Sequence, residues 1–133
     1  MSVYVIDAHA AIELARRGFS PSDEWEMFAP TLLRSQVLAT LRSEVVAGAD
    51  PEEAVKLAER ACRLPRRLLG DAVLRRNAWT ISIEQGWSDT YDAEYIALTR
   101  LHGEALIARS DSLRQRAQGI VQTETVDYLL NPA

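Results

Sequence analysis

The chain has little cysteine, little lysine and no long apolar run. Cys62 is its only cysteine, which excludes an internal disulfide or a cysteine-based metal cluster and fits a reducing compartment. No apolar stretch is long enough for a transmembrane helix. The N-terminal segment lacks the basic region and long apolar stretch of a signal peptide, so none is predicted. We therefore expect a cytoplasmic protein without a membrane partner. No glycine-rich phosphate loop occurs, which argues against ATP or dinucleotide binding.

The length of 133 residues and the apolar share of 47% are typical of one globular domain, and no linker or repeat divides residues 1–133. The net charge of −4 argues against a general nucleic-acid coating protein. Fourteen of the fifteen basic residues are Arg. Arginine binds phosphate through a planar fork, but a GC-rich coding sequence also favours arginine, so this bias is a weak indication of RNA binding.

Short apolar runs alternate with helical patterns along the chain. We predict strands at residues 3–6, 27–29, 105–108 and 119–122, with residues 64–71 as a further strand or a loop. We predict helices at residues 8–17, 31–48, 50–64, 71–85 and 88–102, one or two helical turns at 112–118, and a final turn at Asn131-Pro132.

A short helix from residue 20 is expected to carry Trp25, and Trp79 is expected on or near the core side of its helix. Ser88 or Thr90 is a candidate N-cap, and Gly103 suits a left-handed residue after a helix. Buried strands separated by helices indicate an α/β fold with a short parallel sheet of four or five strands and helices on both faces.

Three carboxylates follow or face the ends of the predicted strands. Asp7 follows the first strand, Asp92 lies in the first turn of a helix, and Asp111 comes just after the strand at residues 105–108. Each has a structural interpretation, as a helix cap, a helix-dipole partner and a turn residue respectively. In open α/β sheets, however, ligands gather at the carboxyl ends of strands. Because clustered carboxylates repel one another unless a cation lies between them, their shared placement favours a metal site.

Four segments carry a resemblance to a known family: VIDAHA, APTLLRSQVLATL, DTYDAEYIALTRLHG and ALIARSD. In this order they resemble PIN-domain proteins, in particular the VapC-type toxins of bacterial toxin–antitoxin pairs. The resemblance covers nearly the whole chain, and TYDAEYIALTRLHG is its most specific part. It implies a PIN-like, three-layer α/β/α fold and a metal-dependent ribonuclease that holds Mg²⁺ or Mn²⁺. It also implies RNA as the substrate, an antitoxin protein as the partner, and a homodimer.

The same resemblance assigns roles to individual residues. Asp7 matches the first carboxylate of the family, Asp92 the one in the Tyr-Asp-Ala motif, and Asp111 the one after the following strand. The second carboxylate of the family usually lies on the long helix, where this chain has Gln36, so the site carries one negative charge fewer. Asp89 lies three residues before Asp92 and is a candidate for reaching the site from the helix start.

The chemistry can also be argued from the residues alone. Cutting a phosphodiester bond needs an activated water and a stabilised leaving oxygen, and Mg²⁺ held by a few Asp residues supplies both. Arg109, two residues before Asp111, is a candidate for holding the substrate phosphate, although its spacing also fits a solvated surface arginine.

Two functions from different classes stay open. The leading hypothesis is a metal-dependent endoribonuclease of VapC type. The alternative is a PIN-like interaction module with an impaired site, which the neutral Gln36 favours. A signalling receiver that is phosphorylated on Asp is disfavoured, because such receivers carry an acidic pair after the first strand and Asp7 stands alone.

Overall fold

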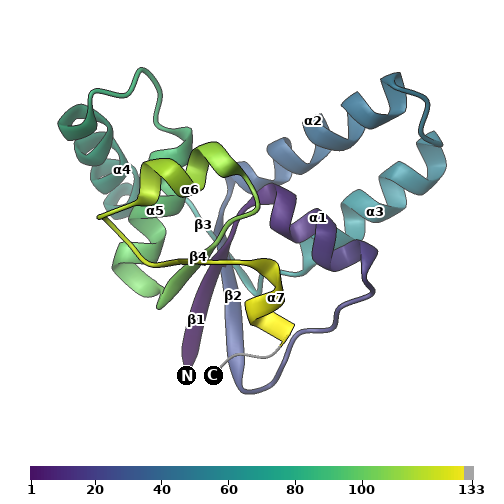
Figure 1. Cartoon of the computed structure of the whole chain (residues 1–133), viewed down its shortest axis with the longest axis horizontal. Coiled ribbons are helices and arrows are strands. Elements are labelled where there is room, and N and C mark those ends of the chain that lie inside the picture. Colours follow the sequence, from purple (N-terminus) through teal and green to yellow (C-terminus); the bar gives the residue numbers. More distant parts are fainter. Residues whose placement is uncertain (131–133) are drawn as a thin grey trace.

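The computed structural model describes residues 1–130, which fold around a central sheet whose five strands all run parallel (Figure 1). The strand order is β3-β2-β1-β4-β5. The strands are β1 (Ser2–Ile6), β2 (Trp25–Pro30), β3 (Arg67–Leu69), β4 (Ala105–Ile107) and β5 (Thr123–Glu124). The helices are α1 (Ala8–Arg16), α2 (Leu32–Val46), α3 (Pro51–Arg63), α4 (Ala72–Gln85), α5 (Tyr91–His102), α6 (Asp111–Ala117) and α7 (Val126–Leu130). The predicted α/β fold with a short parallel sheet is confirmed.

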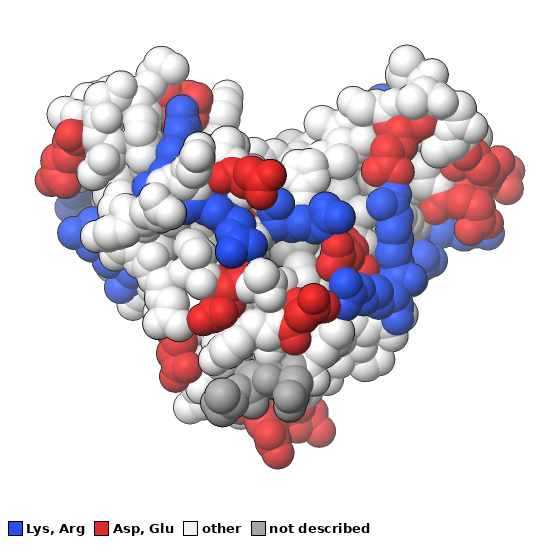
Figure 2. Space-filling model, viewed as in Figure 1, with Lys and Arg blue, Asp and Glu red and all other residues white. Residues whose placement is uncertain are grey.

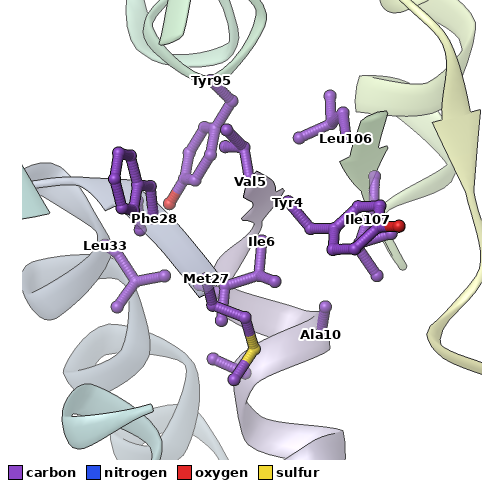
Figure 3. Packing of buried hydrophobic residues seen from close by; sticks show 14 of the residues in the cluster. Tyr4, Val5, Ile6, Ala10, Met27, Phe28, Leu33, Tyr95, Leu106 and Ile107 are labelled. Carbon is purple, nitrogen blue, oxygen red and sulfur yellow. The ribbon is translucent and has the colours of Figure 1, made fainter. Parts of the chain in front are cut away.

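The central strand is β1, which pairs in parallel with β2 on one side and with β4 on the other. Tyr4, Val5 and Ile6 are buried, and Figure 3 shows them within the main hydrophobic cluster. At the carboxyl end of β1, Ile6 lies opposite Ile107 of β4, and the Asp7 N–H donates to the Ile107 carbonyl at 3.1 Å. Asp7 therefore leaves the sheet beside the segment that follows β4.

Helices cover the sheet in two layers, as the three-layer α/β/α prediction requires. α4, α5 and α6 lie on one side, and α1, α2, α3 and α7 lie on the other (Figure 1). α2 and α3 form a hairpin that extends away from the sheet, and Figure 2 shows a hollow between this hairpin and the lobe built by α4, α5 and α6. No helix within residues 1–130 has the length and apolar character needed to cross a membrane.

Aspartates begin three of the helices. Asp7, Asp50 and Asp71 are the N-caps of α1, α3 and α4, and each side chain accepts a hydrogen bond from the backbone N–H three residues later. Such caps satisfy donors that the first helical turn leaves unpaired. Local sequence therefore fixes where these helices start, including the helix whose first turn faces the carboxyl edge of the sheet.

Gly103 ends α5 for a reason other than the predicted one. Its φ is −102°, so its backbone is extended and not left-handed. A Cβ atom at this position would lie 3.2 Å from Val5 Cγ2 and 3.3 Å from Thr99 Cα. Glycine allows the chain to pass close to β1 between α5 and β4.

The predicted helix from residue 20 is wrong, since the chain stays irregular until Trp25 opens β2. The Trp25 ring packs against Tyr4 at a centroid distance of 5.6 Å and against Phe19 at 5.9 Å. This burial of an aromatic side chain over the sheet outweighs the local helix-start signal of Ser20-Pro21.

The predicted strand at residues 119–122 is also wrong, because a turn occupies most of it. Gly119 adopts a φ of 77°, and the N–H groups of Ile120 and Val121 both donate to the Ala117 carbonyl. β5 follows at Thr123. The segment at residues 64–71, left open as a strand or a loop, contains the short strand β3, and the turn expected at Asn131-Pro132 lies outside the described residues.

Two side chains differ from their predicted roles around α4 and α5. Trp79 is 63% exposed, because the buried side of α4 is formed by Leu74, Ala78 and Ile81. Thr90 precedes α5 but makes no side-chain capping bond.

Candidate active site

A pocket of about 210 Å³ lies at the carboxyl edge of the sheet, where the first turns of α1 and α5 meet α2 and the start of α6. It is lined by Asp7, Ala8, His9, Gln36, Ala39, Thr40, Asp92, Tyr95, Ser110 and Leu113. Ligands gather at this edge in open α/β sheets. Three of the residues predicted from the sequence, Asp7, Gln36 and Asp92, are therefore brought together here.

Asp7 is the most constrained side chain of the pocket. It is only 3% exposed, and its Oδ1 accepts from the Ala10 N–H at 2.7 Å. Its Oδ2 accepts from the N–H groups of Arg109 and Ser110, both at 3.1 Å. Burial raises the pKa of Asp7, and the three backbone donors and nearby His9 only partly oppose this rise. The carboxylate is thus held rigidly between α1 and the segment after β4.

Asp92 enters the pocket from the first turn of α5 and is half-buried. Its Oδ2 accepts a hydrogen bond from Arg116 Nη1 at 3.1 Å. Burial raises the pKa of Asp92, while the Arg116 charge lowers it and Asp89 raises it further. The second carboxylate of the pocket is therefore already paired with a cationic side chain of this chain.

Gln36 reaches the pocket from α2 and is bound by Tyr95 of α5. The Tyr95 hydroxyl donates to Gln36 Oε1 at 2.6 Å. Burial raises the pKa of Tyr95 far above its ordinary value, so this hydroxyl remains a donor at physiological pH. The hydrogen bond directs the amide oxygen toward Tyr95 and links the two helices on opposite sides of the pocket.

After β4, Ser110 and Leu113 line the pocket, and Asp111 does not. Ser110 is the N-cap of α6, and its Oγ accepts from the Leu113 N–H at 3.4 Å. Asp111 is the first residue of α6 and is exposed. The start of α6 thus places Ser110 against the pocket, where its hydroxyl contacts the Leu113 N–H and Ser112 Oγ, and the Asp111 carboxylate lies one residue further along the chain.

Arg109 and Asp89 also lie outside the pocket lining. The Arg109 side chain pairs with Glu13 on α1, so only its backbone N–H serves the site, by donating to Asp7. Asp89 Oδ1 is 3.8 Å from Arg116 Nη1.

The sequence analysis did not identify Arg116, Tyr95 or Ser110 as residues of the site. Only Ser110 had a local signal, since a serine before an acidic residue and an apolar periodic stretch is a common N-cap.

The chemistry of the donors fits one hard divalent cation. Mg²⁺ and Mn²⁺ prefer oxygen, and Mg²⁺ is commonly held by one or two carboxylates together with water and substrate phosphate. The pocket lining contains the two carboxylate residues Asp7 and Asp92, and the neutral residues Gln36, Thr40 and Ser110, whose side chains carry oxygen. Within residues 1–130 no group of three or more His, Cys, Asp or Glu side chains is placed to hold a metal ion. The residues therefore fit a weak site for one cation.

Comparisons with known proteins agree with the fold. No protein-family model and no curated protein sequence matches this chain. Among solved structures, PAE2754 from Pyrobaculum aerophilum is similar with a TM-score of 0.74 and 22% identity, over 97% of this chain and 93% of that one. VapBC-1 from nontypeable Haemophilus influenzae is similar with a TM-score of 0.60 and 14% identity, over 94% of this chain and 98% of that one. The chain therefore has a PIN-like fold, which confirms at the level of the fold the resemblance seen in the sequence.

Proposed function

We propose that the pocket is the active site of a metal-dependent endoribonuclease of VapC type. The observation that carries this proposal is that Asp7 and Asp92, which lie far apart in sequence, line one pocket at the carboxyl edge of a PIN-like sheet. The proposed substrate is RNA and the proposed cofactor is Mg²⁺ or Mn²⁺. Because a single cysteine in 133 residues fits a reducing compartment, we propose a cytoplasmic setting.

In this proposal, Asp7 and Asp92 would hold the cation, and Gln36 and Ser110 would be the neutral polar residues beside it. A cation of this kind lowers the pKa of a bound water and offsets charge on the phosphate. Asp7 contributes a carboxylate whose position is fixed by three backbone N–H groups. Tyr95 contributes by orienting the Gln36 amide.

We expect this nuclease to be slow. Removing one full negative charge about 4 Å from a divalent cation weakens binding by roughly 8 kcal/mol at an effective dielectric constant near 20, before desolvation is counted. Both Gln36 and Ser110 present neutral groups to the pocket, and the proposed site therefore relies on two carboxylates. A preference for Mn²⁺ over Mg²⁺ follows, because Mn²⁺ binds mixed ligand sets more tightly.

The test is cleavage of a generic RNA with Mn²⁺ and with EDTA, using parent chain and Asp92→Asn. Asp111→Asn is the matched control, since it removes an equal charge from the same edge of the fold but outside the pocket. We expect metal-dependent cleavage by the parent and the control, and at least about tenfold slower cleavage by Asp92→Asn. Cleavage that is equal in Asp92→Asn and the parent, or that survives EDTA, would rule out this site.

The second candidate function is a PIN-like interaction module whose pocket no longer cleaves RNA. The ion pair between Arg116 and Asp92 favours this candidate, because it neutralises one of the two carboxylates in the pocket. The same assay separates the candidates. A folded parent chain that does not cleave RNA with Mn²⁺, while it still binds a protein partner, supports the module.

Under either candidate we propose an antitoxin protein as partner. The support for this is the structural similarity to VapBC-1, whose name joins VapB and VapC. The α2–α3 hairpin provides an apolar groove for such a partner, lined in part by Leu38, Val45 and Val55. We also propose a homodimer, because α4 exposes Trp79 and Ile83, which lie four residues apart on one face of the helix. Exposed apolar patches of this kind often mark protein interfaces.

A further inference from the structure

Arg116 lies beside the pocket and contacts three groups at once. Its Nη1 is 3.1 Å from Asp92 Oδ2 and 3.8 Å from Asp89 Oδ1. Its guanidinium carbon is 4.8 Å from the centre of the Trp87 ring. About a third of its side chain is exposed, and a little less than a quarter of that of Asp92, so this ion pair is shielded from water better than a typical surface pair.

We propose that Arg116 is a positioning residue that competes with the divalent cation for Asp92. In the absence of a cation the guanidinium serves as the counter-ion of this carboxylate, and it must leave Asp92 Oδ2 for the cation to bind fully. The inference rests on the proposed function and concerns how occupancy of that site is set.

The composition of the pocket makes this competition decisive. Gln36 and Ser110 are neutral, so a cation depends mainly on Asp7 and Asp92. Arg116 offsets part of the negative charge of Asp92, so a cation is attracted to this carboxylate less strongly. The guanidinium also repels the cation directly. With more carboxylates in the pocket, one paired arginine would matter less.

The surroundings of Arg116 give the guanidinium a second place to rest. Trp87 lies against one face of the side chain, and an arginine over an indole ring is favourable by itself. Asp89 offers a second carboxylate outside the pocket lining. Arg116 can therefore release Asp92 while it keeps the ring and transfers its ion pair to Asp89, so occupancy by a cation does not require the site to unfold.

Calorimetric Mn²⁺ titration of the full chain tests the proposal without any activity measurement. Arg116→Gln removes the charge, and Arg116→Met removes the charge but keeps the stem that packs near Trp87. Arg116→Lys restores a positive charge. Arg114→Gln is the matched control, because it lies on the same helix two residues earlier and therefore about 200° around the axis.

We expect Arg116→Gln and Arg116→Met to bind Mn²⁺ about three- to tenfold more tightly than the parent, in line with the strength of a partly shielded ion pair. Arg116→Lys should return the affinity toward that of the parent, and Arg114→Gln should leave it unchanged. Thermal unfolding without metal shows whether each variant is folded. If Arg116→Gln does not fold, the Mn²⁺ affinity of Arg116→Met tests the competition instead.

Three results would overturn the proposal. If the parent binds Mn²⁺ and the folded Gln and Met variants bind no more tightly, Arg116 does not compete and only this inference falls. If Arg114→Gln tightens binding equally, the effect is one of overall charge and again only this inference falls. If neither the parent nor any variant binds Mn²⁺, the cation site itself is absent, and the proposed function falls together with the inference.

Discussion

The Tyr95 hydroxyl donates a 2.6 Å hydrogen bond to Gln36 Oε1 and so connects α5 with α2 on opposite sides of the pocket. Tyr95 is 1% exposed, and its hydroxyl is the only polar group of a ring otherwise packed in the core (Figure 3). A buried hydroxyl needs a partner, and Gln36 supplies one. Gln36 therefore contributes to the structure of the pocket whether or not a cation binds.

Gln36→Glu should tighten Mn²⁺ binding by at least about tenfold and raise RNA cleavage, because it adds a full negative charge to the pocket with almost no change in size. A carboxylate also accepts the Tyr95 hydrogen bond, so the contact between helices is kept. Calorimetric titration and cleavage at matched metal occupancy provide the measurement.

Tyr95→Phe is the control for this prediction. It should destabilise the chain by about 1 kcal/mol through loss of the hydrogen bond, without raising metal affinity. Unchanged affinity and cleavage in Gln36→Glu would mean that position 36 does not face the cation, although it lines the pocket.

Asp7→Asn should destabilise the metal-free chain by about 1–3 kcal/mol. Both carboxylate oxygens accept backbone N–H groups, from Ala10 on one side and from Arg109 and Ser110 on the other. An asparagine amide would turn its NH₂ group toward at least one of these donors. Removing the buried charge relieves the desolvation that raises the pKa of Asp7. Unlike a protonated carboxyl group, however, the NH₂ group cannot accept from the backbone N–H that it faces, so a buried donor is left unpaired. Urea unfolding of parent and variant measures the difference, and a more stable variant would contradict the argument.

Stability of the metal-free chain should fall as the pH rises through the weakly acidic range. The pKa of Asp92 is raised by burial, although Arg116 opposes the rise. The folded chain therefore binds this proton more tightly than the unfolded chain, and the contribution to stability is present below the ordinary aspartate pKa of about 3.9 and is lost as the pH rises through the raised value. Urea unfolding across this range should show a steeper decline for the parent than for Asp92→Asn. Parallel curves for the two proteins would contradict the prediction.

Local sequence predicted the parts of the fold that local physics controls. The apolar runs of β1 and β4 and the Asp7 cap of α1 are each specified within a few residues. Parallel pairing of β1 with β4 then brings Asp7 beside the segment after β4. For this reason the strand ends predicted the edge of the sheet at which the pocket lies.

The parts that could not be predicted depend on contacts between distant residues or on a one-residue shift. Asp92 and Arg116 are 24 residues apart, and no periodicity connects them. The choice between Ser110 and Asp111 depends on the residue at which α6 begins, and either could start a helix. Trp79 lies on a helix whose apolar residues surround it on more than one side, so its exposure was decided by how α4 packs on α5.

Self-association through α4 should depend on Trp79. This side chain is 63% exposed, with Val73 at 55% and Ile83 at 64% on the same helix. Trp79→Ser should lower the fraction of dimer over a concentration series in sedimentation experiments, while folding stability changes by less than about 0.5 kcal/mol, as is usual at exposed positions. Val55→Ser, in the groove of the α2–α3 hairpin, is the matched control. A parent chain that stays monomeric, or a loss of dimer in the control alone, would place the interface elsewhere.

Ser110→Asp tests which residue after β4 belongs to the site. Aspartate is as good an N-cap as serine, so the start of α6 should be kept. The new carboxylate would enter the pocket beside Asp7, whose Oδ2 already accepts from the Ser110 N–H. Without metal, repulsion between these two carboxylates should lower the melting temperature. With Mn²⁺ the same charge should strengthen binding by at least about tenfold, so the rise in melting temperature on adding Mn²⁺ should exceed that of the parent. Asp111→Asn should leave that rise unchanged, because its side chain lies outside the pocket lining. The opposite pattern, with no effect of Ser110→Asp and loss of the Mn²⁺ response in Asp111→Asn, would mean that the resemblance to the family at Asp111 describes the site correctly and that Ser110 serves only as a cap.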